Sequence, residues 1–183
     1  ACRELVVRLS EKLYADAPIR VELDDRDLRG GEKYWQWVKK GVPLTVEIGP
    51  RDLENGSAYV GRRDSGGDRQ GMDCEELVEG VSGILDDIQK VLFARALAFR
   101  EEHTKKIDDK DELYEFFSDD SQGKTIHGGF ALVHWDRDAK WEDQLKNELK
   151  VTVRCIPKDS GEEGTCIFSG NPSPGRVVLA KSY

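Results

Sequence analysis

The feature that most constrains the fold of this chain is one long amphipathic segment near its middle. Asp73, followed three residues later by Glu76, has the spacing of a capping box at a helix N-terminus. Gly80 and Gly83 each weaken a helix by about 1 kcal/mol relative to Ala, and Lys106 is the furthest end that we expect. The pattern predicts one long amphipathic helix, because its apolar residues recur at intervals of three and four: Leu77, Val78, Val81, Leu85, Ile88, Val91, Leu92 and Phe99.

The segment before this helix is predicted to belong with it in one domain, residues 1–106. No capping residue precedes the apolar positions Leu5, Val6, Leu9 and Leu13, so the chain is expected to open inside an element whose upstream part is missing. Alternation and turn residues predict the other elements: a strand over 19–23, a break at 30–31, a short aromatic core helix over 34–38 that stops at Gly41, a strand over 42–48, a turn at 49–50, a hairpin signal at 55–56, a strand over 57–62 and a polar loop over 65–71.

The sequence after residue 106 has a different pattern of predicted helices and strands. Residues 107–128 are predicted to be a linker that carries one short helix, from the capping residues Asp108 and Asp109 to Phe117. Residues 129–183 are predicted to form a small α/β domain of a size that often needs a metal or a docked neighbour for stability. Its expected elements are a strand over 130–135, a helix over 141–149 and strands over 151–156 and 176–181.

Composition and charge favour a globular protein of the cytoplasm. Apolar runs are far shorter than the roughly 20 residues of a membrane helix, and no secretory leader opens the sequence, so we expect no membrane partner. The four cysteines lack the spacing of a disulfide framework and are expected to be reduced thiols. The net charge of −8 comes from the second part, because residues 1–70 carry 13 basic and 13 acidic side chains. The first part therefore remains a candidate for contact with RNA.

The sequence contains no motif for catalysis or for holding a cofactor. Glycine-rich phosphate loops, HExxH and Ser/His/Asp orderings are absent. His103, His127 and His134 share no local motif with a nucleophile, so packing or surface roles are expected for them. We expect no catalytic residue and no bound cofactor in this chain.

Two constellations invite a binding interpretation. In the turn after residue 48, Arg51 can pair with the acceptor edge of guanine and Asp52 can accept from its amino group, although a solvated ion pair is the alternative that the residues alone favour. Cys155 and Cys166, with His134 or Asp136, invite a zinc interpretation. Residues 166–169 have the spacing of a Cys-x-x-Cys knuckle whose second sulfur is replaced by a hydroxyl, so no bound metal is expected.

Seven stretches of the chain resemble the C-terminal part of the archaeal/eukaryote-like prolyl-tRNA synthetases, with an anticodon-binding domain followed by a zinc-binding-type domain. They are spread from residue 26 to residue 183, so the resemblance covers essentially the whole chain. They are residues 26–33 (RDLRGGEK), 37–44 (WVKKGVPL), 46–53 (VEIGPRDL), 96–104 (ALAFREEHT), 129–132 (GFAL), 152–157 (TVRCIP) and 178–183 (VLAKSY).

The resemblance implies an α/β fold: an anticodon-binding domain with a mixed sheet flanked by helices, its first strand missing here, and then a small α/β domain. The family attaches proline to tRNA(Pro) with ATP, using a class II catalytic domain that lies N-terminal to these domains. The parent protein is thus expected to bind ATP and Mg²⁺, to contact tRNA(Pro) and to form a homodimer, and this chain alone is expected to be inactive. The alternative is a standalone anticodon-binding-like module with a regulatory or protein-interaction role.

The resemblance also assigns roles to individual positions. It favours an RNA-binding role for Arg51 and Asp52 over the solvated ion pair that the residues alone favour. Family members recognise the guanines of the anticodon partly with a basic residue and an aspartate after Gly-Pro, here Arg51 and Asp52. Two further positions, a glutamate and an arginine in some relatives, are Val38 and Thr45 here. These four residues are the tRNA-binding candidates.

In the tail domain the resemblance implies a zinc site that has lost most of its ligands. The family's ligand positions correspond here to Asp136, Trp141, Cys166 and Ser169, and Cys155 matches a position outside that set. We therefore expect the domain to fold without zinc, with Trp141 filling the space. The family's terminal tyrosine, here Tyr183, docks with its carboxylate against the catalytic domain, and a frayed terminus is the alternative.

Overall fold

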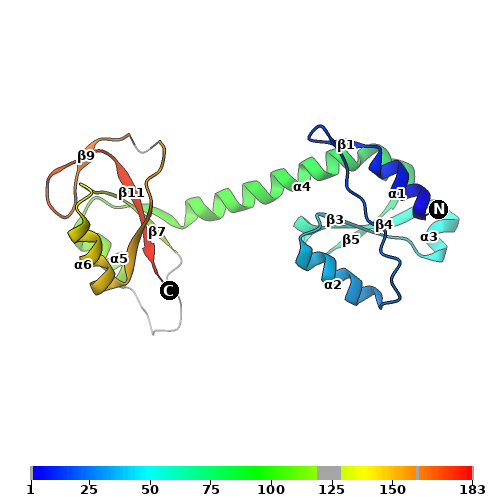
Figure 1. Ribbon diagram of the computed structural model, residues 1–183, viewed down its shortest axis with the longest axis horizontal. Coiled ribbons are helices and arrows are strands. Elements are labelled where there is room, and N and C mark those ends of the chain that lie inside the picture. The colour runs from blue at the N-terminus through cyan, green and yellow to red at the C-terminus, as the bar shows by residue number, and fades with distance from the viewer. Residues whose placement is uncertain (1, 119–128, 160, 183) are drawn as a thin grey trace. The chain divides into compact units, whose positions relative to one another are not determined.

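The computed structural model describes residues 2–118, 129–159 and 161–182. It divides into two compact units, Ala1–Ala96 and Leu97–Tyr183. The division falls inside the long helix α4 (Cys74–Glu102), which therefore contributes to both units (Figure 1). The α/β class expected from the sequence is confirmed by this arrangement of helices and sheets.

The first unit is a three-stranded antiparallel sheet with helices on both faces. Its strands lie in the order β3 (Leu44–Glu47), β4 (Ser57–Arg62) and β5 (Arg69–Asp73). Helices α1 (Cys2–Ser10) and α4 lie on one side of the sheet and α2 (Gly30–Lys40) on the other (Figure 1). The core lies on the side of α1 and α4, and its buried members are Leu5, Leu9, Val60, Leu77, Val78 and Val81.

Local sequence rules explain the elements that the sequence predicts correctly here. Asp73 Oδ1 accepts the backbone N–H groups of Glu75 and Glu76, at 2.8 and 3.2 Å, so it caps α4 as its spacing indicates. The predicted bounds of the strand over 57–62 are those of β4. The opening helix is confirmed as α1, but it ends before Leu13, which lies in the short hairpin of β1 (Leu13–Tyr14) and β2 (Ala17–Pro18).

Four predictions for the first unit are wrong. Residues 19–23 belong to no strand, although Ile19 and Val21 pack on the core. Gly30 and Gly31 do not break the chain but begin α2. The turn and hairpin at 49–56 are instead the short helix α3 (Pro50–Asn55), which ends at Gly56 in the left-handed conformation. The polar loop over 65–71 contains the end of η1 (Arg63–Ser65) and most of β5, because strand pairing with β4 outweighs its glycine-rich composition.

The second unit has a four-stranded mixed sheet in the order β6 (Thr104–Lys106), β7 (Phe130–His134), β11 (Arg176–Lys181), β8 (Val151–Cys155). β6 pairs with β7 in parallel, and the other pairs are antiparallel. Helices α5 (Lys110–Ser118) and α6 (Ala139–Leu149) and the short hairpin of β9 (Gly164–Thr165) and β10 (Pro172–Ser173) complete it. The predicted helices and long strands after residue 107 are confirmed within one or two residues.

The predicted linker over residues 107–128 differs from the structure where the structure describes it. Leu113 and Phe117 on α5 are buried in the core of the second unit, together with Ile107. The linker interpretation rested on polar composition. One apolar face on a nine-residue helix is nevertheless enough to pack the helix on the core. Residues 119–128, which include His127, lie outside the described residues, as does Tyr183.

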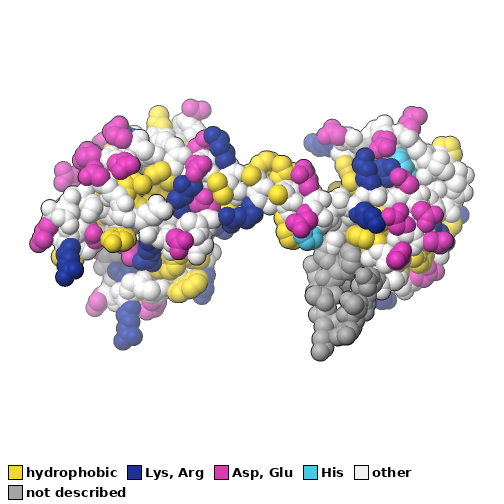
Figure 2. All heavy atoms as spheres, turned by 180° about the vertical axis from the view of Figure 1, so that it is seen from behind, with side chains coloured by type: hydrophobic (Ala, Val, Ile, Leu, Met, Phe, Trp, Pro, Cys, Tyr) yellow, Lys and Arg dark blue, Asp and Glu magenta, His cyan; other side chains and the backbone are white. Residues whose placement is uncertain are grey.

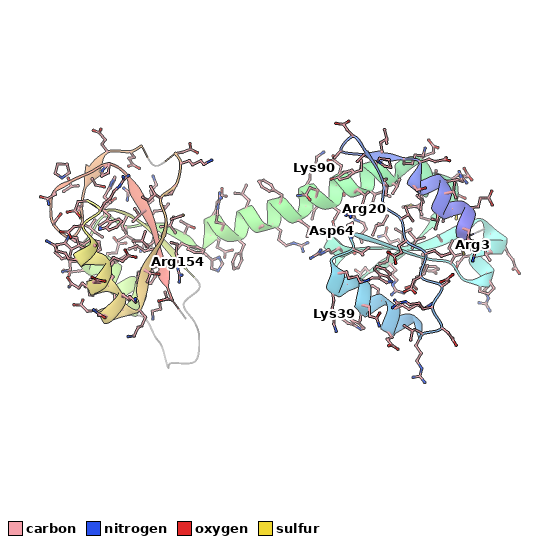
Figure 3. The ribbon with its side chains drawn as sticks, viewed as in Figure 1. Arg3, Arg20, Lys39, Asp64, Lys90 and Arg154 are labelled. Carbon is pink, nitrogen blue, oxygen red and sulfur yellow. The ribbon has the colours of Figure 1, made fainter. Side chains whose placement is uncertain are left out.

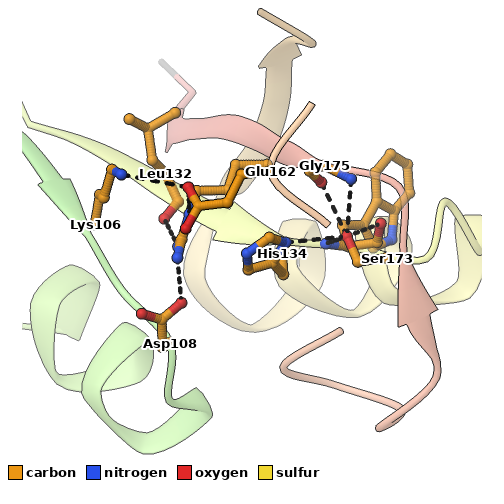
Figure 4. Close-up of polar contacts among 9 residues, drawn as sticks. Lys106, Asp108, Leu132, His134, Glu162, Ser173 and Gly175 are labelled. Atoms are coloured by element: carbon orange, nitrogen blue, oxygen red, sulfur yellow. Dashed lines mark hydrogen bonds and ion pairs between the residues drawn. The ribbon is translucent and has the colours of Figure 1, made fainter. Parts of the chain in front are cut away.

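A buried arginine ties three segments of the second unit together (Figure 4). The Arg176 side chain pairs with Asp108 at 2.7 Å and with Glu162 at 3.3 Å, and it donates to the Leu132 carbonyl. Beside it, His134 is buried, with Nδ1 3.3 Å from the Ser173 hydroxyl. That hydroxyl contacts four backbone groups of residues 135 and 175, so it is a structural group and not a nucleophile. The packing role expected for His134 agrees with this geometry.

Candidate nucleic-acid interface

A hollow of about 180 Å³ opens in the first unit between α2 and the sheet. Tyr34, Trp35 and Val38 from α2 form its aromatic and apolar wall, and Thr45 and Gly61 from β3 and β4 line its sheet side. Trp35 is 62% exposed and Val38 is 38% exposed, so this wall faces solvent. Such a space is smaller than the usual 300–1,000 Å³ site of a drug-sized ligand and suits one flat ring system.

The close approach of strands at the hollow depends on Gly61. A Cβ atom at this position would lie 2.7 Å from the Thr45 hydroxyl and 3.4 Å from Arg69 Cγ. Because residue 61 has no side chain, Thr45 Oγ1 donates to the Gly61 carbonyl, at 3.3 Å, and Arg69 extends across the strand. The Arg69 guanidinium then stacks on the Tyr34 ring, 4.7 Å from its centroid.

Two arginines at the rim of the hollow are held in place by other groups. Arg62 pairs with the buried carboxylate of Asp64 and with Asp87 on α4, and Figure 3 shows Asp64 beside that helix. Hydrogen bonds from Arg62 hold the pKa of Asp64 below its usual value, and the two carboxylates raise the pKa of Arg62. Arg63 donates to the Gly41 carbonyl at 2.8 Å, and its guanidinium occupies the space that a Cβ at residue 41 would need.

The loop before α2 is fixed to the helix by one carboxylate. Asp24 accepts hydrogen bonds from the Arg26 guanidinium and from the Trp37 indole N–H, the latter at 2.7 Å. The Arg26 hydrogen bond is the largest cause that lowers the pKa of Asp24. These bonds turn Trp37 toward the loop, where Lys40 lies over its ring at 4.0 Å. Trp37 therefore already has partners in Asp24 and Lys40, whereas Trp35 on the same helix remains exposed.

Helix α3 presents the two residues that the sequence singles out, in different states. The Asp52 carboxylate accepts the backbone N–H of Gly49, at 2.8 Å, so it fixes the start of the helix. Arg51 is exposed, and its side chain has no hydrogen bond or ion pair within the part of the chain that the structure describes. The bland alternative of an Arg51–Asp52 ion pair is therefore not the observed arrangement.

The four tRNA-binding candidates thus divide into two places. Val38 and Thr45 line the hollow, and Arg51 and Asp52 lie on α3 at the other end of β3. The sequence alone misses Tyr34 and Trp35 as members of the site, whereas Arg63 is among the basic residues that it offers as possible phosphate contacts. It treats the aromatic residues of α2 as core, yet no residue of α2 is buried. The signal that was available is the mixture of aromatic and basic residues along this helix, which is typical of a surface that binds nucleic acid.

The family's zinc-ligand positions in the second unit form a hydrogen-bonded cluster. The Asp136 carboxylate accepts from the Ser169 hydroxyl, from the Asn171 amide at 3.2 Å and from the backbone N–H of Asp138 at 3.1 Å. These bonds, with the Ser169 hydroxyl as the largest cause and the Cys166 thiol as a smaller one, lower the pKa of Asp136. The Trp141 ring stacks on Phe168, with centroids 5.5 Å apart.

This donor set does not fit a structural zinc ion. It contains one thiol and one carboxylate that already accepts three hydrogen bonds, while a hydroxyl is a poor ligand and an indole cannot coordinate. The Trp141 indole nitrogen is buried and has no hydrogen-bond partner among the described residues. Within those residues no group of three His, Cys, Asp or Glu side chains is arranged to hold a metal. Cys155 lies exposed at the end of β8, and all four cysteines are free thiols.

Comparison with protein families agrees with this two-unit arrangement. A family model described as "Anticodon binding domain" matches residues 1–84, and one described as "Prolyl-tRNA synthetase, C-terminal" matches residues 119–183. The chain belongs to the prolyl-tRNA synthetase family. It carries the anticodon-binding domain and the C-terminal domain of that family, as the resemblance in its sequence indicates.

Individual relatives point the same way. The chain is 48% identical to "Proline--tRNA ligase 2" of Anaeromyxobacter dehalogenans, over all of this chain and 37% of the relative, and 40% identical to "Proline--tRNA ligase" of Protochlamydia amoebophila, over 98% and 36%. The crystal structure of prolyl-tRNA synthetase from Cryptosporidium parvum, complexed with L-proline and AMP, aligns with a TM-score of 0.75 and 26% identity, over all of this chain and 36% of that one.

This chain therefore spans little more than a third of the length of these prolyl-tRNA synthetase relatives. The alternative of a standalone regulatory module is not favoured, because the matches to synthetases cover both units of the chain. No described helix has both the length and the apolar composition that crossing a membrane requires.

Proposed function

We propose that this chain is the part of a proline--tRNA ligase that recognises the anticodon of tRNA(Pro). The observation that carries the proposal is the exposed guanidinium of Arg51 at the start of α3, which has no partner among the described residues, in a domain of the anticodon-binding family. An arginine fork matches the O6 and N7 acceptors of guanine, and such a contact discriminates by about 1–3 kcal/mol. Unpaired anticodon bases expose these edges, which are the edges that proteins use to recognise RNA.

Asp52 supports Arg51 in two ways in this proposal. By accepting the Gly49 N–H it fixes the first turn of α3, from which the Arg51 side chain extends. Its second carboxylate oxygen remains available to accept from the guanine amino group. The role of Asp52 is thus partly positioning, while Arg51 makes the direct contact.

The hollow beside α2 takes a second part of the RNA in this proposal. Its exposed Trp35 offers a ring face to an unpaired base, and the Thr45 hydroxyl and the Val38 side chain line the same hollow. Arg63, together with Lys39 on α2, supplies positive charge for phosphates (Figure 3). Basic and acidic side chains are otherwise interspersed on the faces that Figure 2 shows, so we propose local contacts and not one broad basic surface.

The parent enzyme then attaches proline to tRNA(Pro) with ATP and Mg²⁺, which bind to a class II catalytic domain outside this chain. We propose that the C-terminal unit docks against that domain through Tyr183, and that the parent is a cytoplasmic homodimer. The sequence contains no motif for an adenylate site, so this chain should give no proline-dependent pyrophosphate exchange by itself. A pyrophosphate-exchange signal from the purified chain would contradict this assignment.

Binding of an isolated RNA stem–loop tests the function directly. The chain should bind a stem–loop that carries the proline anticodon more tightly than a matched stem–loop whose two anticodon guanines are replaced by cytosines, by about 5- to 150-fold for one bidentate contact. Equal affinity for the two RNAs at several salt concentrations would leave only phosphate binding and would reject anticodon recognition.

A further inference from the structure

The face of the first sheet that is turned away from α4 carries a half-exposed tyrosine. Side chains alternate between the two faces of a strand, so Val46, Val60 and Met72 pack on the core while Tyr59 points to the other side. Tyr59 is 50% exposed, although the residues before and after it are buried. Tyr59 therefore offers an open aromatic ring on this face of the sheet.

The strand register shows why the Tyr59 ring is left open. Glu47, Tyr59 and Gly71 lie opposite one another on β3, β4 and β5. Gly71 has no side chain, and a Cβ atom built there would meet nothing within 4 Å. One side of the Tyr59 ring therefore has no cross-strand neighbour to cover it.

The other side of the ring adjoins the candidate RNA site. Two residues further along β4 is Gly61, which lines the hollow, and the Arg69 side chain crosses β4 between Gly61 and Tyr59 to pair with Glu47. The same Arg69 guanidinium stacks on Tyr34 at the wall of the hollow. Beyond Glu47, β3 leads within three residues into α3. Tyr59 thus occupies the row of the sheet between the hollow and the start of α3.

We propose that Tyr59 is a stacking platform for an unpaired base of the bound RNA, placed between the contacts made at the hollow and those made by α3. This inference rests on the proposed function of the chain. Single-strand binding proteins use exposed aromatic side chains on a sheet face in this way, because every base has a π face and stacking tolerates any sequence. The Arg69–Glu47 pair would fix both of these side chains beside Tyr59 and leave the Tyr59 ring free for a base.

The test compares Tyr59→Leu and Tyr59→Phe in this chain, with the anticodon stem–loop of tRNA(Pro) as the probe. Loss of one stacked base should weaken binding by roughly tenfold for Tyr59→Leu, and Tyr59→Phe should bind like the parent sequence because the ring face is kept. The dependence of affinity on salt should stay unchanged, since no phosphate contact is lost. Phe93→Leu is the matched control: Phe93 is an exposed aromatic residue of α4, 64% open, and its loss should leave affinity unchanged.

A second RNA series locates the stacked base. Stem–loops with one abasic position in the loop should include one that loses the same factor with the parent sequence and loses nothing further with Tyr59→Leu, as a double-mutant cycle requires for partners in contact. If Tyr59→Leu binds the intact stem–loop as tightly as the parent sequence, Tyr59 is no platform. If the parent sequence binds no stem–loop at all, the proposed function fails and this inference fails with it.

Discussion

The candidate RNA-binding residues of the first unit and the zinc-ligand positions of the second unit differ in whether their side chains have partners. In the first unit the side chains proposed to bind RNA are left free: Arg51 has no partner among the described residues and Trp35 is exposed. In the second unit two of the positions that the resemblance assigns to zinc bond each other, because Asp136 accepts a hydrogen bond from Ser169 as well as from Asn171.

This contrast suggests how a position that still binds its ligand can be told from one that no longer does. A residue that still binds a ligand keeps donors or acceptors unsatisfied in the free protein, and neighbouring residues hold it in place, as Asp52 holds the start of α3. A residue whose ligand has been lost acquires partners within the chain, since buried polar groups without partners are costly. By this criterion we expect that Arg51 still binds a ligand and that Asp136 does not. The predictions below set these two residues against each other.

The largest effect is expected for Asp136→Ala. This change removes the acceptor of a charge-assisted cluster and leaves the Ser169 hydroxyl, the Asn171 amide and the Asp138 N–H without it, which should destabilise the second unit by about 2–3 kcal/mol. Chemical unfolding followed by tryptophan fluorescence measures the change. The control is Asp138→Ala, which removes the cap of α6 and an exposed ion pair with Lys140 and should cost about 1 kcal/mol. Equal effects of the two substitutions would mean that Asp136 is no more than another turn residue.

The next effect is on binding and leaves stability unchanged. Arg51→Ala should weaken binding to the proline anticodon stem–loop by about 1–3 kcal/mol and should have little effect on a stem–loop without the guanines. The melting temperature should not change, because the exposed Arg51 side chain has no partner within the described residues to lose. A matched control is Arg20→Ala, another exposed arginine of the first unit that does not line the hollow. If Arg51→Ala weakened both RNAs equally, Arg51 would contact a phosphate.

A smaller effect separates the cluster from simple packing by its response to acid. The pKa of Asp136 is lowered in the folded state, so its carboxylate stabilises the protein above its unfolded pKa of about 3.9, and this contribution is lost as the pH falls through the lower folded value. The second unit of the parent sequence should therefore lose more stability between pH 5 and pH 2 than that of Asp136→Asn. Parallel stability curves for the two proteins would show that the charge at Asp136 contributes nothing.

Much of the fold follows from local sequence rules, and the failures have physical causes. The long helix and the strand over residues 57–62 follow from the spacing of apolar residues, and the start of the helix follows from its capping residue Asp73. Residues 19–23 alternate as a strand does, but a strand also needs a neighbour for its hydrogen bonds, and that depends on tertiary structure. β5 shows the converse, because pairing with β4 makes a strand of a segment whose composition predicts a loop.

The sequence indicates which residues belong to the candidate sites, but it does not show which of them are already bonded to other groups of the protein. Residue types at family positions indicate Arg51 and Asp52, yet only the structure shows that Asp52 caps α3 while Arg51 stays free. The aromatic residues of α2 were misjudged because burial depends on what packs against a helix, and one face of α2 borders an open hollow. Likewise Ile156, the last residue of the strand predicted over 151–156, is 47% exposed because β8 ends at Cys155.

The most direct test of the account is metal analysis of the purified chain, combined with melting and RNA binding before and after a strong chelator. Because the cluster around Asp136 already satisfies its own polar groups, the chain should contain no stoichiometric zinc, and the chelator should change neither the melting temperature nor the affinity for the anticodon stem–loop. Near-stoichiometric zinc, with a melting temperature that falls on chelation, would contradict the account, since Cys155, Cys166 and His134 or Asp136 would then be holding a metal.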